Sequence, residues 1–109
     1  MKRPYFWLGI DAEPRKPRKV KEVQDEVAAY FQIPRRLMTC ASRDGARQRQ
    51  VAMYLAREFT PMSLPNIGRH FGNRDHTTVI HGIRAVIERI ETDADLAADI
   101  EILRERLAA

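Results

Sequence analysis

The sequence predicts an all-α protein, a compact bundle of about six helices that contains a helix-turn-helix. Apolar residues recur at spacings of three and four along most of the chain, which is the period of one helix face. The β-branched residues follow the same spacing and do not alternate with polar residues, as they would in a strand. Pro and Gly fall between the apolar stretches, where helices end. At 109 residues, the chain is long enough for one domain with a modest core.

Residues 1–19 are expected to form a flexible basic and aromatic arm, and residues 20–109 a helical domain. Prolines interrupt regular structure in the first stretch, which also contains a basic run. The adjacent aromatic residues Tyr5, Phe6 and Trp7 are unusual in such an arm, so they could dock on this domain or on another chain.

The N-terminal apolar patch is too short for a secretory signal. It holds about six residues where a signal needs roughly 7–15, and Asp11 and Glu13 follow instead of a small-residue cleavage site. No run approaches the ~20 apolar residues of a membrane span. These observations predict a cytoplasmic protein with no membrane partner.

The first helix is expected to begin at Val20, and Pro34 is expected to end it. Its apolar residues share one face: Val20, Val23, Val27 and Phe31. A short helical turn is expected over residues 35–39, with Arg35 and Arg36 facing solvent.

Residues 40–45 are small and polar, which predicts a loop. Cys40 is the only cysteine of the chain. It therefore excludes an internal disulfide and argues against a structural zinc site. We expect it to be a small buried residue.

The next two helices are predicted over residues 46–59 and 63–71. Apolar stripes support both of them: Val51, Leu55 and Phe59 in the first, and Leu64, Ile67 and Phe71 in the second. Ser63 is a good N-cap for the second helix, and Gly72 suits a left-handed conformation at its end.

Two more helices complete the bundle, one over about residues 75–90 and one that Thr92 or Asp93 can cap. Asp75 can cap the first of them or lie in its first turn, where the helix dipole favours an acid. Their apolar faces are Val79, Ile80, Ile83, Val86, Ile87 and Ile90 in one, and Leu96, Ile100, Leu103 and Leu107 in the other.

Charge is distributed unevenly along the chain. Residues 1–21 carry a net charge of +5, residues 22–90 of +3 and residues 91–109 of −4, which sum to the net +4 of the whole chain. A basic front and middle with an acidic tail suits a polyanionic partner. A solvated charged face would also explain the basic residues.

The stretch from Gly72 to His81 is the most informative one. A short helix, a Gly turn and a longer helix with a polar tip form the pattern of a helix-turn-helix that binds DNA. Within that tip His76 and Thr77 are placed to meet base edges in a major groove. Asp75 could accept from a cytosine amine, or cap the helix and orient a neighbour.

The unpaired N–H groups of the first helical turn suit phosphate oxygens, and we expect Thr78 and Arg74 to add phosphate contacts there. A second basic group lies upstream, between Arg43 and Arg57. All ten basic residues between 22 and 90 are Arg, which can donate two hydrogen bonds to one phosphate. A solvated helix face is the alternative.

These motifs resemble the C-terminal DNA-binding domain of the bacterial replication initiator DnaA. The strongest match is Ser63–Gly68 together with Phe71–His81, which contains the Arg-Asp-His-Thr-Thr-Val core typical of the family's recognition helix. Residues 46–53 are similar to the family's segment rich in Arg and Gln, although Gln48 stands where the family usually has Pro.

The resemblance implies a role for each matching residue on double-stranded DNA. The residues that would meet bases are Asp75, His76 and Thr77 in the major groove and Arg43 in the minor groove. Those that would hold the phosphate backbone are Arg49, Gln50, Arg57, Thr60, Leu64, Arg74 and Thr78. We therefore expect sequence-specific binding at DnaA-box-like sites, in replication control or transcription regulation.

The initiator that this chain resembles also carries an ATPase domain. No Gly-x-x-x-x-Gly-Lys-Ser/Thr motif occurs in these 109 residues. We therefore expect DNA binding without ATPase activity, and no cofactor.

Two other functions are possible on the sequence alone. The aromatic start and the acidic last helix could make the chain a protein-interaction adaptor for a replication or transcription protein, with weak or no specific DNA binding. An enzyme could use His70, His76 and His81, but His76 and His81 are five residues apart and do not share a helix face as a metal pair would. We expect no catalytic or metal-binding residues, with His81 packed or half-buried in its helix and His70 on an outer side.

Overall fold

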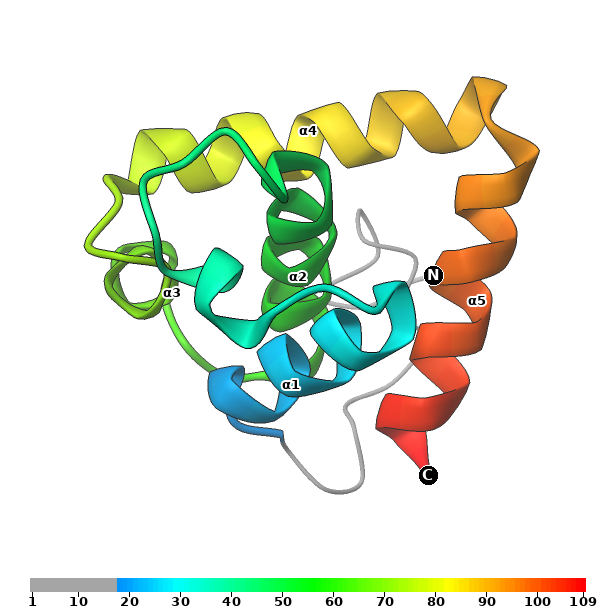
Figure 1. Ribbon diagram of the computed structural model, residues 1–109, viewed down its shortest axis with the longest axis horizontal. Helices are drawn as coiled ribbons and strands as arrows, with labels where there is room; N and C mark the ends of the chain where they lie inside the picture. The colour runs from blue at the N-terminus through cyan, green and yellow to red at the C-terminus, as the bar shows by residue number, and fades with distance from the viewer. Residues whose placement is uncertain (1–17) are drawn as a thin grey trace.

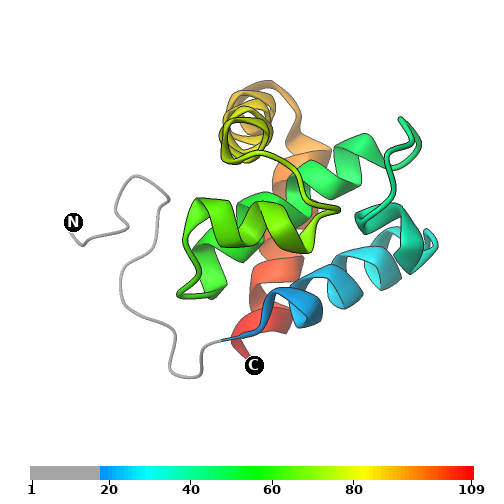
Figure 2. The ribbon, with the colours of Figure 1, turned by 90° about the vertical axis from the view of Figure 1, so that its left-hand side faces the viewer.

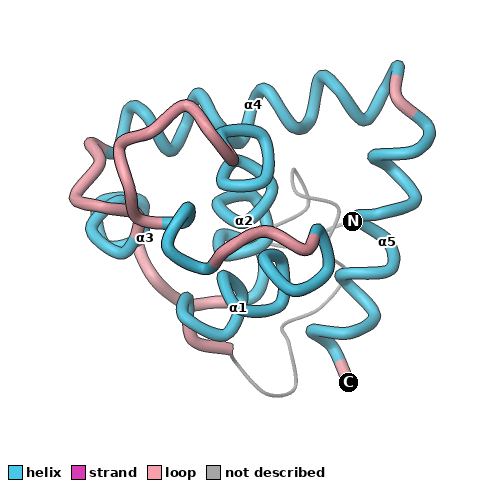
Figure 3. The backbone as a smooth tube through the Cα atoms, in the orientation of Figure 1, coloured by secondary structure: helices cyan, strands magenta, loops and turns pink. Residues whose placement is uncertain are grey.

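The computed structural model describes residues 18–109, which form five α-helices and one short 3-10 helix (Figure 1). The elements are α1 (Val20–Phe31), η2 (Arg35–Met38), α2 (Ala46–Phe59), α3 (Leu64–His70), α4 (His76–Thr92) and α5 (Ala94–Ala108). Only helices and loops occur in this part of the chain, which confirms the all-α prediction (Figure 3). The expected arm over residues 1–19 lies outside the described residues, apart from its last two, and stays a prediction.

Helix α2 lies at the centre and contacts every other helix (Figures 1 and 2). Its residues Val51, Ala52, Leu55 and Ala56 have almost no exposed surface. The two alanines leave room for neighbouring side chains to pack closely against the α2 backbone. The predicted apolar stripe of this helix is therefore the middle of the core.

The corner between α4 and α5 is built on Asp93. Its backbone ends α4, and its carboxylate accepts a hydrogen bond of 3.0 Å from the Leu96 N–H at the start of α5. This selects one of the two predicted caps. The corner turns α5 back along the bundle, where Ile100, Leu103 and Leu107 are buried.

A buried polar cluster joins α5 to the end of α2. Arg104 lies 2.9 Å from a carboxylate oxygen of Glu58 and donates to the Tyr54 hydroxyl at 2.7 Å. Only 7% of Glu58 is exposed. Burial raises the pKa of Glu58 to about 6, although the nearby Arg104 acts in the opposite direction.

The two ends of the described region are tied together by Arg18. Its backbone N–H donates to the Phe59 carbonyl at 3.0 Å. Its guanidinium donates to the carbonyls of Leu107 at 2.8 Å and Ala109 at 2.5 Å. None of the helices between residues 18 and 109 combines the length and apolar character needed to cross a bilayer.

Candidate nucleic-acid interface

Helices α3 and α4 form the predicted helix-turn-helix. Ser63 caps α3 by accepting a hydrogen bond from the Asn66 N–H at 3.3 Å. Fully buried Ile67, Phe71 and Val79 belong to the core on which the two helices pack. The two helices therefore lie close to the predicted residues, and their apolar stripes face the core as predicted.

The turn between the two helices depends on glycine. Gly72 has a φ of +80° and the following Asn73 a φ of +57°, so two consecutive residues are left-handed. Gly72 follows the last residue of α3 by two positions, and its left-handed conformation confirms that prediction. A Cβ on Gly68 would lie 2.2 Å from the Arg74 carbonyl oxygen, so the α3 backbone is in direct contact with the turn.

The tip of α4 presents four consecutive exposed residues, Asp75 to Thr78. Asp75 is the N-cap and accepts a hydrogen bond from the Thr77 N–H at 3.3 Å. Its other carboxylate oxygen is 3.4 Å from Nδ1 of His76. Hydrogen bonds from the Thr77 side chain and backbone lower the pKa of the Asp75 carboxyl. Of the roles predicted for Asp75, capping and orienting its neighbours are therefore seen directly.

The exposed row continues along α4 beyond this tip. His81 and Arg84 are both exposed, four and seven residues after Thr77, which places them on the same side of the helix. The prediction that His81 is packed or half-buried was wrong. The spacing of four residues from Thr77 indicates the exposed side, whereas the spacing of five from His76 does not.

Arg43 lies in the loop that joins η2 to α2 and is exposed. Arg49, predicted to contact phosphate, is in contrast 5% exposed. Its guanidinium donates to the carbonyls of Leu37 at 2.5 Å, Ser42 at 2.7 Å and Asp44 at 3.3 Å. In this structure Arg49 therefore anchors the loop around Arg43, and its contact with phosphate stays untested.

Arg74 is half-buried between the turn and the same loop. One guanidinium nitrogen donates to the Phe71 carbonyl and another to the Cys40 carbonyl at 2.8 Å. Cys40 itself is half-buried, so the expectation of a buried cysteine was only partly right. Arg74 thus links the helix-turn-helix to the loop that carries Arg43.

The other residues predicted to hold phosphates differ in exposure. Thr78 is exposed, while Gln50, Arg57 and Leu64 are half-buried. Gln50 accepts a hydrogen bond from Arg89 of α4. Thr60 is buried, and its hydroxyl donates to the Ala56 carbonyl at 2.7 Å. Contact of each with DNA remains a prediction.

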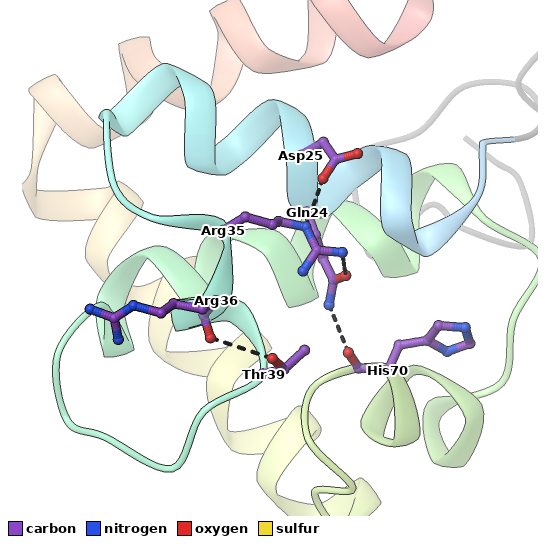
Figure 4. A network of polar contacts seen from close by, with 6 residues as sticks. All are labelled: Gln24, Asp25, Arg35, Arg36, Thr39 and His70. Atoms are coloured by element: carbon purple, nitrogen blue, oxygen red, sulfur yellow. Dashed lines mark hydrogen bonds and ion pairs between the residues drawn. The ribbon is translucent and has the colours of Figure 1, made fainter.

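Buried Gln24 fixes the end of α3 against α1 and η2 (Figure 4). It donates to the His70 carbonyl at 2.8 Å and accepts from Arg35 at 2.6 Å. Arg35 also pairs with Asp25 at 2.7 Å. Arg35 is therefore half-buried and bound, contrary to the prediction that it faces solvent, whereas Arg36 is exposed as expected. Sequence spacing could not reveal this network, because its members meet only when three elements pack.

An open concavity of about 360 Å³ lies beside the tip, where α3 approaches the start of α4. Its lining residues are Pro65, Arg69, Asn73, Arg74, Asp75 and His76. Exposed Arg69 was missed from the sequence, and its position near the C-terminus of α3 is the signal that could have found it. Two arginines and a histidine make this concavity suitable for an anion.

No group of three His, Cys, Asp or Glu side chains within residues 18–109 is arranged to hold a metal ion. His70 is exposed, as predicted, and its Nδ1 lies 2.9 Å from the Asn66 carbonyl oxygen.

Comparison with known proteins identifies the same helix-turn-helix. Residues 20–86 match the family described as "Bacterial dnaA protein helix-turn-helix". The chromosomal replication initiator protein DnaA of Cereibacter sphaeroides is 48% identical over 97 residues, which cover 83% of this chain and 20% of that protein. The protein of the same name from Chromobacterium violaceum is 50% identical over 90 residues, which cover 81% and 19%.

The DnaA of Gluconobacter oxydans is 48% identical over 90 residues, which cover 81% of this chain and 19% of that protein. The chain thus spans about a fifth of the length of the curated relatives that it matches. The matched residues 20–86 include the whole turn and tip described above.

Proposed function

Since the chain belongs to the helix-turn-helix family of bacterial DnaA proteins, we propose that it binds double-stranded DNA at DnaA-box-like sites. The observation that carries this proposal is the exposed, capped tip of α4. Asp75, His76, Thr77 and Thr78 are all exposed, and their polar side chains can meet bases or phosphates. Binding to chromosomal DNA would take place in the cytoplasm.

In the proposed complex, the tip of α4 enters a major groove. His76 and Thr77 contact base edges there, and Asp75 holds both in position from the N-cap. Thr78 and the first N–H groups of α4 meet the phosphate backbone. Arg43, from the loop before α2, reaches bases in the adjacent minor groove.

The remaining contacts fix the register of the domain on the duplex. Leu64 at the start of α3, together with Gln50, Arg57 and Thr60 of the α2 region, would meet phosphates on either side of the groove. Arg49 and Arg74, which hold protein carbonyls in this structure, would act mainly through the loop that they anchor.

Binding at such sites would serve replication control, because the relatives are named as chromosomal replication initiators. Regulation of transcription is the second setting for the same activity. Mapping of occupied sites on a bacterial chromosome would separate the two, since replication control predicts occupancy concentrated at the origin.

The test of DNA binding is titration of the protein into a DnaA-box duplex and a scrambled duplex at several salt concentrations. We expect at least about 10³-fold tighter binding to the box at physiological salt. Affinity for both duplexes should fall as salt rises, because phosphate contacts release counterions. Equal affinity for the two duplexes would reject specific recognition.

The same titration tests the adaptor alternative, which predicts weak binding to both duplexes. On the described surface, Ile102 is the exposed large hydrophobic residue, and one exposed isoleucine is ordinary for a protein surface. The described residues therefore favour DNA as the partner.

A further inference from the structure

We propose that Arg49 and Arg74 are positioning residues, which hold the loop over residues 39–44 in the shape that presents Arg43 to DNA. This inference rests on the proposed function, in which Arg43 contacts bases. It gives buried Arg49 and half-buried Arg74 a task different from direct contact with phosphate.

Arg49 reaches the loop from the first turns of α2. Its two terminal nitrogens donate to three carbonyls of the segment that leads into this helix, those of Leu37, Ser42 and Asp44. The planar guanidinium can hold several acceptors at once, which the single ammonium group of a lysine cannot match in geometry. One side chain of α2 therefore holds the loop at Ser42 and at Asp44.

Arg74 reaches the same loop from another part of the fold, the turn before the recognition helix. It donates to the Cys40 carbonyl at 2.8 Å and to the Phe71 carbonyl of its own turn. A Cβ on Gly72 would lie 2.2 Å from the Thr39 carbonyl oxygen, so turn and loop touch through their backbones. Burial and then the charge of Arg74 lower the pKa of Arg49, in keeping with two guanidinium groups close together.

Arg43 lies between two of the anchored carbonyls, those of Ser42 and Asp44. Its own carbonyl accepts from the Ala46 N–H at 3.1 Å, while its side chain is exposed. The backbone on both sides of Arg43 is thus fixed by hydrogen bonds. A side chain that contacts nucleobases needs a rigid backbone beneath it. Only then is its position relative to His76 fixed well enough to select a DNA sequence.

The experiment compares Arg49→Lys and Arg74→Lys with Arg36→Lys, a matched control at an exposed position of η2. Each variant is measured against duplexes that carry every single base-pair change in the box. Arg43→Ala identifies the base pairs that depend on Arg43, and His76→Ala those that depend on the recognition helix. Thermal unfolding confirms that each variant is folded.

We expect Arg49→Lys to lose about tenfold in discrimination, only at the base pairs that Arg43→Ala affects. Combined with Arg43→Ala, it should cause no further loss. Discrimination at the base pairs of His76 should persist, and Arg36→Lys should behave as the unchanged protein. Should Arg49→Lys fail to fold, Arg74→Lys at its half-buried site gives the same comparison.

Three results would overturn the proposal. One is an equal loss for all duplexes with a salt slope lower by about one, since Arg49 would then meet phosphate itself. Another is a loss that adds to that of Arg43→Ala, and the third is an Arg43→Ala variant with unchanged base preferences. Failure of the proposed function would look different, because the unaltered protein would then not distinguish box from scrambled DNA.

Discussion

At the scale of single residues, His76 is the side chain on which base recognition should depend most. It is exposed at the tip of α4 and lies 3.4 Å from the capping carboxylate of Asp75. We expect His76→Ala to cost about 1–3 kcal/mol of binding to the box and to relax the preference at one base pair. Binding titrations with box and scrambled duplexes measure this, and an equal loss on both would remove His76 from base recognition.

Position 72 has no room for a side chain, so it requires glycine. Its φ of +80° disfavours any other residue, and a Cβ would meet the Thr39 carbonyl oxygen at 2.2 Å. We expect Gly72→Ala to lower the free energy of unfolding by at least about 2 kcal/mol. Denaturation in urea gives the value.

Asn73 provides the control for this substitution, because its φ of +57° is also left-handed. Asn73→Gly relieves that conformation and should leave stability unchanged or slightly higher. A stable Gly72→Ala variant would mean that the turn and the loop can move apart.

Arg49 shows where prediction from residues ends. Its type and its place beside other arginines indicated a phosphate contact, and the structure buries it instead. Two of the carbonyls that it binds, those of Ser42 and Asp44, belong to a loop whose path is defined only after η2, α2 and the turn have packed. No spacing rule contains that information, whereas exposed Thr77 and His76 follow directly from their place in the first turn of a helix.

At the scale of elements, the sequence predicted almost every boundary. Apolar spacing, Pro34, Ser63 and Gly72 are local signals, and each helix begins or ends where they indicate. Helix α4 differs at its end, because its apolar face predicts an end near Ile90 and the helix runs to Thr92. The choice between Thr92 and Asp93 as the next cap also remained open, because both residue types are good caps.

That corner yields a prediction about α5. Since the Asp93 carboxylate accepts from the Leu96 N–H, Asp93→Ala should cost about 0.5–2 kcal/mol of stability. Thr92→Ala at the neighbouring exposed position should cost much less, and Asp93→Asn should retain most of the cap. Thermal unfolding of the three variants measures these losses of stability. Equal losses for Thr92→Ala and Asp93→Ala would contradict the role of Asp93 as the cap of α5.

At the scale of the whole molecule, the buried cluster between α2 and α5 should make stability depend on pH. The pKa of Glu58 is raised from 4.5 to about 6 in the folded protein, so folding favours its protonated form. Its contribution to stability is fully present below about pH 4.5 and is lost as pH rises through about 6. The shift corresponds to about 2 kcal/mol.

Urea unfolding between pH 4.5 and 7 measures this contribution as a fall in the free energy of unfolding. Glu58→Gln removes the titrating group and should flatten the curve over that range, whatever its effect on stability at a single pH. An unchanged slope in Glu58→Gln would show that another group titrates there. DNA binding provides a further control, because Glu58 pairs with Arg104 of α5 and its substitution should leave base preferences intact.

The contacts of Arg18 with Leu107 and Ala109 have a consequence for connectivity. Because the first and last described residues already touch, a short linker could close this domain into a ring, and the ring could be reopened at exposed Pro61. In the circular permutant, the ribosome would then synthesise α3, α4 and α5 before α1 and α2. The start of α4 lies at the upper left of Figure 1 and the C-terminus at the lower right, so the order of synthesis would change while the tip of α4 would keep its own chain connections.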